Sequence, residues 1–441
     1  MAIATLTTEA TATGIASDIV AGKLSARDAT EAAIARIEAL DGPINAVVVR
    51  DFDAARAAAN RLDDEGPQAG QPLFGVPMTV KESFNLAGHP STWGLEYARN
   101  NIAPSDAAVV KRLKRAGAVI VGKTNVPPDL ADWQSNNPVY GRTNNPHDLD
   151  RTPGGSSGGA AAAVSAGMLP CEFGSDIGGS IRVPAHYCGI WGHKPTFDVI
   201  SLEGHGYPGT DSARPALSVC GPLARSAEDL ATLLEVTLDH PLQRRDVAIK
   251  GGRFLLIDEQ PMVGCSRGYR AELDRVAGQI EDAGGQVERR SEWIPDLAAS
   301  HDSYLKMLNI AMAGGLPAPD GTQATVRDWF DLCDIQARVY RQWRDLFGAF
   351  DFVLAPVSAT PAFRHHDGQI FQGNIEIDGE NLPASPQLAW AGLVTFPGLP
   401  ATVLPIGTVD GLPVGMQVIG DRFQDYQTID GARQIGALLA T

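Results

Sequence analysis

A serine behind two glycines is the first residue of this sequence that could carry out covalent chemistry. Ser180 stands in GSDIGGSIR, residues 174–182. Glycine lets the backbone turn sharply, so successive N–H groups can point into one space and stabilise the oxyanion of a tetrahedral intermediate. The expected donors are the backbone N–H groups of Ile177, Gly178, Gly179 and Ser180. The competing interpretation is a tight turn that carries a surface serine.

A second serine cluster lies upstream, in PGGSSGG at residues 153–159. A phosphate-binding loop would end in Gly-Lys-Ser/Thr, whereas this run is followed by alanine. The run also satisfies Gly-x-Ser-x-Gly, which would make Ser157 the nucleophile of a strand-turn-helix elbow. That elbow needs a buried strand before it, and the preceding NNPHDLDRTP cannot form one. The cluster therefore predicts a functional loop of another kind.

A base for such serines could come from Lys81, which follows the apolar run GVPMTV. Burial disfavours the charged form of an amine, so a buried lysine can lose its proton and act as a general base. The alternative is a lysine that reaches solvent or pairs with a carboxylate such as Glu82. His186, six positions after Ser180, is a second candidate base.

The elements that must position these residues alternate between helical and strand patterns, which favours an α/β layered fold. Helices are expected over residues 12–40 with a start near Ser25, and over 51–63, 106–116, 226–236 and 269–284. Apolar runs predict strands in FGVPMTV, at 118–123, at 253–258, and in FDFVLAPVSATPAF, LPATVLPIG and LPVGMQVIG. Residues 134–159 form a long loop, of a length that is usually functional. Residues 290–350 are interpreted as a helical insertion.

Composition narrows the class of protein. The net charge of −16 repels phosphate backbones, so no nucleic-acid partner is expected. The five cysteines form no C-x-x-C pair, which argues against a zinc or redox motif. The start of the chain lacks a signal-peptide pattern, and no run of about 18 apolar residues predicts a membrane span. We expect a cytoplasmic protein without membrane association.

Six motifs occur in an order that resembles the amidase signature family. They are GVPMTVKESFNLAG, GKTNVPPDLADWQ, YGRTNNP, TPGGSSGGAAA, GSDIGGSIRVPA and GHKPT. The C-terminal segment FPGLPATVLPIGTVDGLPVGMQVIGDRFQD is also similar to that family. The resemblance covers most of residues 10–235 and 350–430 and is weak across 240–350. One departure lies in the nucleophile motif, where GSD replaces the commoner GTD.

The resemblance implies a fold and a mechanism. The fold would be α/β, with a large mixed twisted β-sheet between layers of α-helices, as a single domain over residues 1–441. Residues 240–350 would contribute a helical cover over the substrate cleft. The catalytic triad would be nucleophile Ser180, a bridging Ser156 in a cis peptide, and base Lys81, acting through an acyl-enzyme. Supporting roles are expected for Ser157, Asp176 and Arg182, with no metal and no organic cofactor.

The substrate is less defined by these motifs. The resemblance implies hydrolysis of a small or medium carboxamide, with aryl amides as candidates and esters, carbamates or urethanes as side substrates. Three aromatic residues near the motifs are candidates for the substrate pocket: Trp133, Tyr140 and Trp191. The alternative function is that of the glutamine-hydrolysing component of an amidotransferase for tRNA-linked amidation. We expect a monomer or a homodimer.

Overall fold

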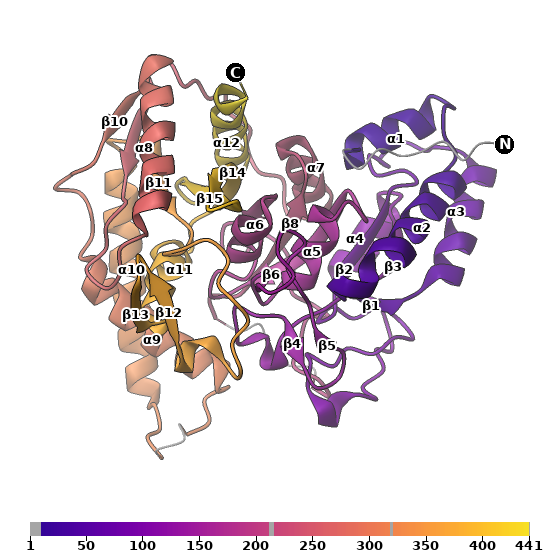
Figure 1. The fold of residues 1–441 in the computed structure, drawn as a ribbon, viewed down its shortest axis with the longest axis horizontal. Coiled ribbons are helices and arrows are strands. Elements are labelled where there is room, and N and C mark those ends of the chain that lie inside the picture. Colours follow the sequence, from indigo (N-terminus) through magenta and orange to yellow (C-terminus); the bar gives the residue numbers. More distant parts are fainter. Residues whose placement is uncertain (1–9, 211–215, 318–320, 441) are drawn as a thin grey trace.

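One large sheet organises the computed structural model, which describes residues 10–210, 216–317 and 321–440. In these residues eleven strands are ordered β1-β3-β2-β6-β8-β7-β14-β15-β11-β9-β10. Pairing is parallel among β3, β2 and β6 and among β10, β9 and β11, and antiparallel at the other contacts. Helices lie on both sides of this sheet (Figure 1). The expected α/β class, with a mixed sheet between helical layers, is confirmed.

The strands have the following bounds. The large sheet contains β1 Val47–Arg50, β2 Pro77–Lys81, β3 Val119–Thr124, β6 Cys171–Asp176, β7 Trp191–Lys194, β8 Val219–Ala224, β9 Arg253–Leu256, β10 Gln286–Glu288, β11 Phe352–Pro356, β14 Ala401–Val409 and β15 Leu412–Ile419. Two small hairpins pair β4 Asn136–Asn137 with β5 Gly141–Arg142, and β12 Asn374–Ile377 with β13 Glu380–Pro383.

The helices have the following bounds. They are α1 Ala12–Val20, α2 Ala26–Ile44, α3 Phe52–Glu65, α4 Ala108–Arg115, α5 Gly158–Ser165, α6 Arg182–Cys188, α7 Ala227–Thr237, α8 Arg267–Asp282, α9 Leu297–Met312, α10 Val326–Leu346, α11 Leu388–Thr395 and α12 Asp425–Leu439. Short 3₁₀ turns span Glu96–Ala98, Pro128–Leu130, Ile370–Gln372 and Ser385–Gln387.

The N-terminal helical pattern divides into two helices. α1 ends at Val20, and Gly22 then adopts φ +71°, in the left-handed region that glycine tolerates. Ser25 begins the next helix, because its hydroxyl accepts the backbone N–H of Asp28 at 2.9 Å. The expected helix start near Ser25 is therefore confirmed, and the helical pattern over 12–40 is interrupted between Val20 and Ala26.

Beyond the N-terminal helices, the structure contains both an expected helical insertion and a strand that local patterns did not indicate. The helical insertion at 290–350 consists of α9 and α10, which pack into a hydrophobic cluster with Trp343 and Trp390. Strand β7 was missed because it includes the polar His193 and Lys194. Both are buried in the sheet, where Thr402, Asp425 and backbone carbonyls supply hydrogen bonds. Hydrogen-bond partners, most of them far away in the chain, make these polar residues compatible with a central strand.

Neighbouring strands bring the motif residues together. Lys81 is the last residue of β2, and β2 pairs with β6, which leads into the Ser180 turn. Helix α5 follows the serine loop and packs closely, since a Cβ placed on Gly159 would lie 2.3 Å from the backbone nitrogen of Asn125. The small residues of this helix therefore set how near the loop lies to the sheet.

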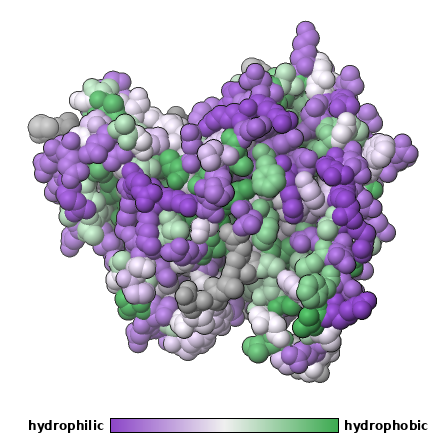
Figure 2. Space-filling view, turned by 180° about the vertical axis from the view of Figure 1, so that it is seen from behind, coloured by the Kyte–Doolittle hydropathy of each residue, from purple (hydrophilic) through white to green (hydrophobic). Residues whose placement is uncertain are grey.

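The surface is mainly polar on the face drawn in Figure 2, with smaller hydrophobic patches between hydrophilic residues. Within the described ranges, no helix combines the length and the apolar character that crossing a membrane requires.

Candidate active site

Lys81 lies at the centre of the candidate site. Its side chain is fully buried, and its Nζ lies 2.6 Å from Ser156 Oγ and 2.9 Å from Ser175 Oγ. Burial lowers the pKa of Lys81 to about 7, against the opposing effect of the Asp176 and Glu172 carboxylates. A substantial fraction of the amine is therefore neutral near pH 7, as a proton acceptor must be.

The serine loop is held in place by packing and by backbone hydrogen bonds. The Gly155–Ser156 peptide is cis, and a Cβ on Gly155 would lie 2.3 Å from the Asp132 carbonyl oxygen. The Ser157 N–H donates to the Ser180 carbonyl at 3.2 Å, and its hydroxyl donates to the Ser175 carbonyl at 3.3 Å. Ser157 thus links the loop to the turn that carries Ser180.

The Ser180 turn is tight and almost wholly buried. Ser180 is 5% exposed, and the preceding Gly179 adopts φ +92°, which favours glycine. The Gly179 N–H donates to the Asp176 side chain at 2.9 Å, so one of the four expected oxyanion donors already has a partner. Among the described residues, no hydrogen bond joins the hydroxyls of Ser156 and Ser180.

A buried ion pair braces this turn. Arg182 donates to both oxygens of Asp176 at 3.0 Å, and Asp176 also accepts the Ile181 N–H at 3.1 Å. Although burial opposes it, the Arg182 guanidinium lowers the pKa of Asp176 to about 2. Arg182 further donates to Ala391, Thr395 and Gln417. The pair therefore anchors the turn to α11 and β15.

Two aromatic side chains orient the peptide groups before Ser180. The Trp133 indole N–H donates to the Gly178 carbonyl at 2.8 Å, and the Tyr304 hydroxyl donates to the Ile177 carbonyl at 3.0 Å. In a trans peptide the N–H points opposite to the carbonyl, so these bonds fix the N–H groups of Gly179 and Gly178. The sequence did not single out Tyr304, because it lies on α9, where the motifs give no signal.

The other two aromatic candidates have different surroundings. The Tyr140 hydroxyl donates to Glu82 Oε1 at 3.1 Å. Trp191 lies on β7 with its indole ring against Gly436 of α12 and close to the hydrophobic core. The next residue, Gly192, faces α6 instead, and successive strand residues point to opposite faces. The structure thus does not bring Trp191 to the Ser180 side of the sheet, which argues against its expected contact with substrate.

The site also contains two side chains that the sequence motifs did not indicate, those of Ser175 and His205. Ser175, on β6, contacts Lys81, and the only signal was the departure of GSD from GTD. His205 Nε2 lies 3.1 Å from Ser175 Oγ and 3.0 Å from Ser83 Oγ. Burial, together with the nearby Lys81, lowers the pKa of His205 to about 3, so its ring is neutral.

His186 serves the structure rather than the nucleophile. Its Nδ1 accepts the Gly415 N–H at 2.7 Å, and its Nε2 lies 3.0 Å from the Thr360 carbonyl. Burial lowers its pKa to about 4. Both ring nitrogens are therefore engaged away from Ser180, which excludes the alternative Ser–His arrangement in this conformation.

Comparisons with known proteins agree with this geometry. A family model described as Amidase matches residues 28–311 and 322–429. The chain is 31% identical to the indoleacetamide hydrolase of Bradyrhizobium diazoefficiens, covering 95% of this chain and 84% of that protein. It is 30% identical to a component of the glutamyl-tRNA(Gln) amidotransferase of Symbiobacterium thermophilum, covering 93% of each.

Among solved structures, a bacterial aryl acylamidase of the amidase signature family superposes with a TM-score of 0.84 at 25% identity, covering 97% of this chain and 96% of that one. The family model and these relatives extend over nearly the whole chain, including most of residues 240–350, where the motifs gave only a weak resemblance. The chain therefore belongs to the amidase signature family and is a hydrolase of amide C–N bonds.

Proposed function

We propose that this hydrolase works through Ser180 as nucleophile, Ser156 as bridging hydroxyl and Lys81 as base. The observation that carries the proposal is the 2.6 Å separation of Lys81 Nζ and Ser156 Oγ, two side chains that are both buried. A neutral amine at hydrogen-bond distance from a hydroxyl is the arrangement that general-base catalysis requires.

Acylation begins when the Ser180 oxygen attacks the amide carbon. The proton of Ser180 passes to Ser156 Oγ, while Ser156 gives its own proton to Lys81 Nζ. Catalytic hydrogen bonds often form fully only with substrate bound, so Ser156 and Ser180 would come within reach at that stage. As the C–N bond breaks, the amine nitrogen takes a proton from Ser156, which recovers one from Lys81.

The tetrahedral intermediates need donors for the negative oxygen. We propose the N–H groups of Ile177, Gly178 and Ser180, with Gly179 contributing only if its N–H is shared with Asp176. One such donor is worth about 3–4 kcal/mol of transition-state stabilisation. Water then attacks the acyl carbon by the same relay, and free Ser180 and the carboxylic acid are released.

For the substrate we propose a small or medium carboxamide that carries an aryl group. Two relatives support this class by their names, indoleacetamide hydrolase and aryl acylamidase. The proposed helical cover from residues 240–350 is supported by Tyr304 of α9, whose hydroxyl contacts the Ile177 carbonyl beside the nucleophile. Esters and carbamates would react as side substrates, since their carbonyl carbons accept the same attack.

Similarity to the amidotransferase component keeps a second candidate function open, release of ammonia from glutamine for tRNA-linked amidation. Under this alternative the chain would act with partner subunits. Glutaminase activity that depends on such subunits would favour it over the free aryl amidase.

The test is a panel of amides, esters and carbamates assayed with wild type, Ser180→Ala and Lys81→Ala. Ser180→Ala should lower turnover by at least about 10³-fold, because the nucleophile is lost. Lys81→Ala should impair amides more than esters, because an amine leaving group needs a proton. Circular dichroism checks that both variants fold. Wild-type turnover by folded Lys81→Ala at neutral pH would contradict the proposed base.

A further inference from the structure

A buried chain of hydrogen bonds continues past Lys81, away from Ser156. Ser175 Oγ lies 2.9 Å from Lys81 Nζ, and His205 Nε2 lies 3.1 Å from Ser175 Oγ. Ser175 is 4% exposed and His205 is 3% exposed. The His205 ring therefore contacts the base through a single hydroxyl.

The direction of these hydrogen bonds decides where Lys81 can accept a proton. A neutral amine has one lone pair and two N–H bonds. The relay needs that lone pair to face Ser156, so Lys81 must donate an N–H to Ser175. Ser175 must then send its own hydrogen elsewhere, because a hydroxyl that donated to Lys81 would occupy the same lone pair.

His205 is the acceptor that meets this requirement. With its proton on Nδ1, its Nε2 accepts from Ser175 in competition with Ser83, whose Oγ lies 3.0 Å from the same nitrogen. Ser175 then accepts from Lys81. With the proton on Nε2, the ring would donate to Ser175 and turn the Ser175 hydrogen toward Lys81. The two tautomers therefore favour opposite directions of the Lys81 lone pair.

We infer that His205 is a positioning residue, whose unprotonated Nε2 orients the Ser175 hydroxyl so that the lone pair of Lys81 faces Ser156. This inference rests on the proposed function, because it assigns His205 a role only if Lys81 is the base.

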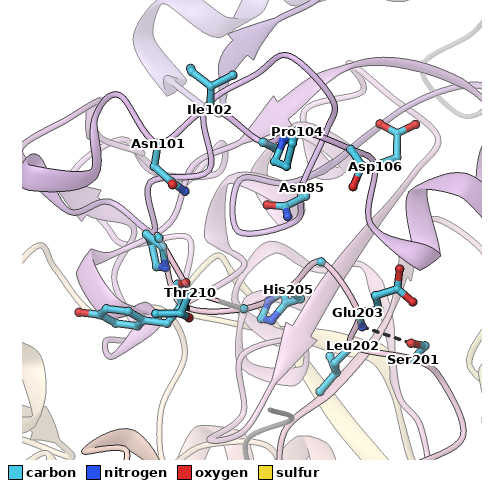
Figure 3. A pocket seen from close by; sticks show the side chains of 17 residues that line it. Asn85, Asn101, Ile102, Pro104, Asp106, Ser201, Leu202, Glu203, His205 and Thr210 are labelled. Atoms are coloured by element: carbon cyan, nitrogen blue, oxygen red, sulfur yellow. Dashed lines mark hydrogen bonds between the residues drawn. The ribbon is translucent and has the colours of Figure 1, made fainter. Parts of the chain in front are cut away.

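Aromatic packing holds the ring in place and suits a fixed, neutral acceptor, although Nδ1 has no hydrogen-bond partner among the described residues. Its centroid lies 4.7 Å from that of Phe84 and 5.3 Å from that of Trp93, so the ring is held between aromatic side chains. His205 lies in the wall of a cavity of about 770 Å³, between Thr210 and Leu202 in the view of Figure 3. The contacts with Phe84 and Trp93 restrain the rotation that would move Nε2 away from Ser175.

The first experiment measures activation of Ser180 without a known substrate. A fluorophosphonate probe phosphonylates an activated serine: the serine oxygen bonds to phosphorus, the P–F bond breaks and fluoride leaves, and the serine proton passes to the relay base. In His205→Phe, which keeps an aromatic ring but removes the acceptor, the maximal labelling rate should fall by about 10- to 100-fold. This is smaller than the roughly 10²- to 10⁴-fold effect of losing a general base, because Lys81 itself is retained. The concentration for half-maximal rate should stay unchanged, because His205 acts through Lys81 and not on the probe. An unchanged labelling rate would overturn the inference.

A double-mutant cycle separates positioning from packing. If His205 acts through Ser175, His205→Phe should have little further effect in a Ser175→Ala background. Phe84→Leu is the matched control, because it perturbs the same stack without removing a hydrogen bond. Its smaller effect should be the same in both backgrounds. If His205→Phe instead slows labelling by the same factor in the wild-type and Ser175→Ala backgrounds, the ring contributes only packing.

Two further measurements keep the inference testable if His205→Phe folds poorly. His205→Gln can place an amide oxygen near the former Nε2 position, and it should recover part of the labelling rate; labelling no faster than in His205→Phe would count against the inference. Nitrogen NMR of wild-type protein with labelled histidine reports the tautomer directly. The expected result is a proton on Nδ1, and a proton on Nε2 would overturn the assignment.

Lys81→Ala distinguishes the two proposals. If labelling is slow in Lys81→Ala but normal in His205→Phe, the relay stands and only the role of His205 fails. If labelling is normal in Lys81→Ala, the proposed function itself fails.

Discussion

At the level of single residues, the environment of Lys81 matters more than its identity. The sequence contains other lysines with buried side chains, such as Lys123 and Lys194. Lys194 contacts two backbone carbonyls, and Lys123 contacts one carbonyl and the Ser91 hydroxyl, which itself donates to a backbone carbonyl. Lys81 instead contacts two serine hydroxyls. A carbonyl can only accept, but a hydroxyl can also donate. Among these three lysines, Lys81 is therefore the best placed to take a proton from its partners.

The pH dependence of activity tests the state of this amine. Lys81 accepts a proton only when neutral, and burial lowers its pKa to about 7. We therefore expect kcat/KM for an aryl amide to rise with increasing pH through an inflection near 7 and to fall as the pH is lowered below it. Spontaneous hydrolysis and circular dichroism over the same range serve as controls. An inflection near the ordinary lysine pKa of about 10.4 would contradict the assignment.

At the level of elements, helix termini and buried carboxylates fix how the outer helices meet the sheet. Asp229 of α7 accepts the backbone N–H groups of Ala12 and Thr13 at the start of α1, at 2.8 and 2.9 Å. A carboxylate at a helix N-terminus satisfies unpaired donors and complements the helix dipole. Asp229 itself is buried, so these two hydrogen bonds offset the cost of removing its carboxylate from water.

Asp229→Ala should therefore weaken the docking of α1. The free energy of unfolding is expected to fall by about 2 kcal/mol, the range for hydrogen bonds to a charged acceptor. Urea denaturation followed by circular dichroism measures the change. Asp18→Ala is the control, since Asp18 also belongs to α1 but forms an exposed pair with Lys23. A similar midpoint for both variants would refute the role of Asp229.

At the level of the whole molecule, the sheet connects the two halves of the chain. It runs without interruption from β1 to β10, and the Asp176–Arg182 pair on one half bonds to Thr395 and Gln417 on the other. We propose on this basis that residues 1–441 form one domain. The candidate site would then need both halves in place.

If the chain forms one domain that contains the whole site, we predict that its activity requires no other polypeptide. The chain purified alone should hydrolyse aryl amides as a monomer or a homodimer, with negligible release of ammonia from glutamine. Light scattering after size exclusion gives the mass, and coupled ammonia detection gives the glutaminase rate. Strong glutaminase activity that appears only with added amidotransferase subunits would favour the alternative function.

The sequence by itself determined the motifs, the α/β class and the identity of Lys81, Ser156 and Ser180 as candidates. The strand and turn patterns are local, since they depend on neighbouring residues, whereas the triad followed from the resemblance of the ordered motifs to the amidase signature family. Tertiary structure alone decided the roles of Ser175, His205 and Tyr304, and it turned Trp191 toward α12. Their hydrogen bonds join residues far apart in the chain. The lowered pKa of Lys81 is also a result of the tertiary structure, because it is caused by burial among the surrounding elements.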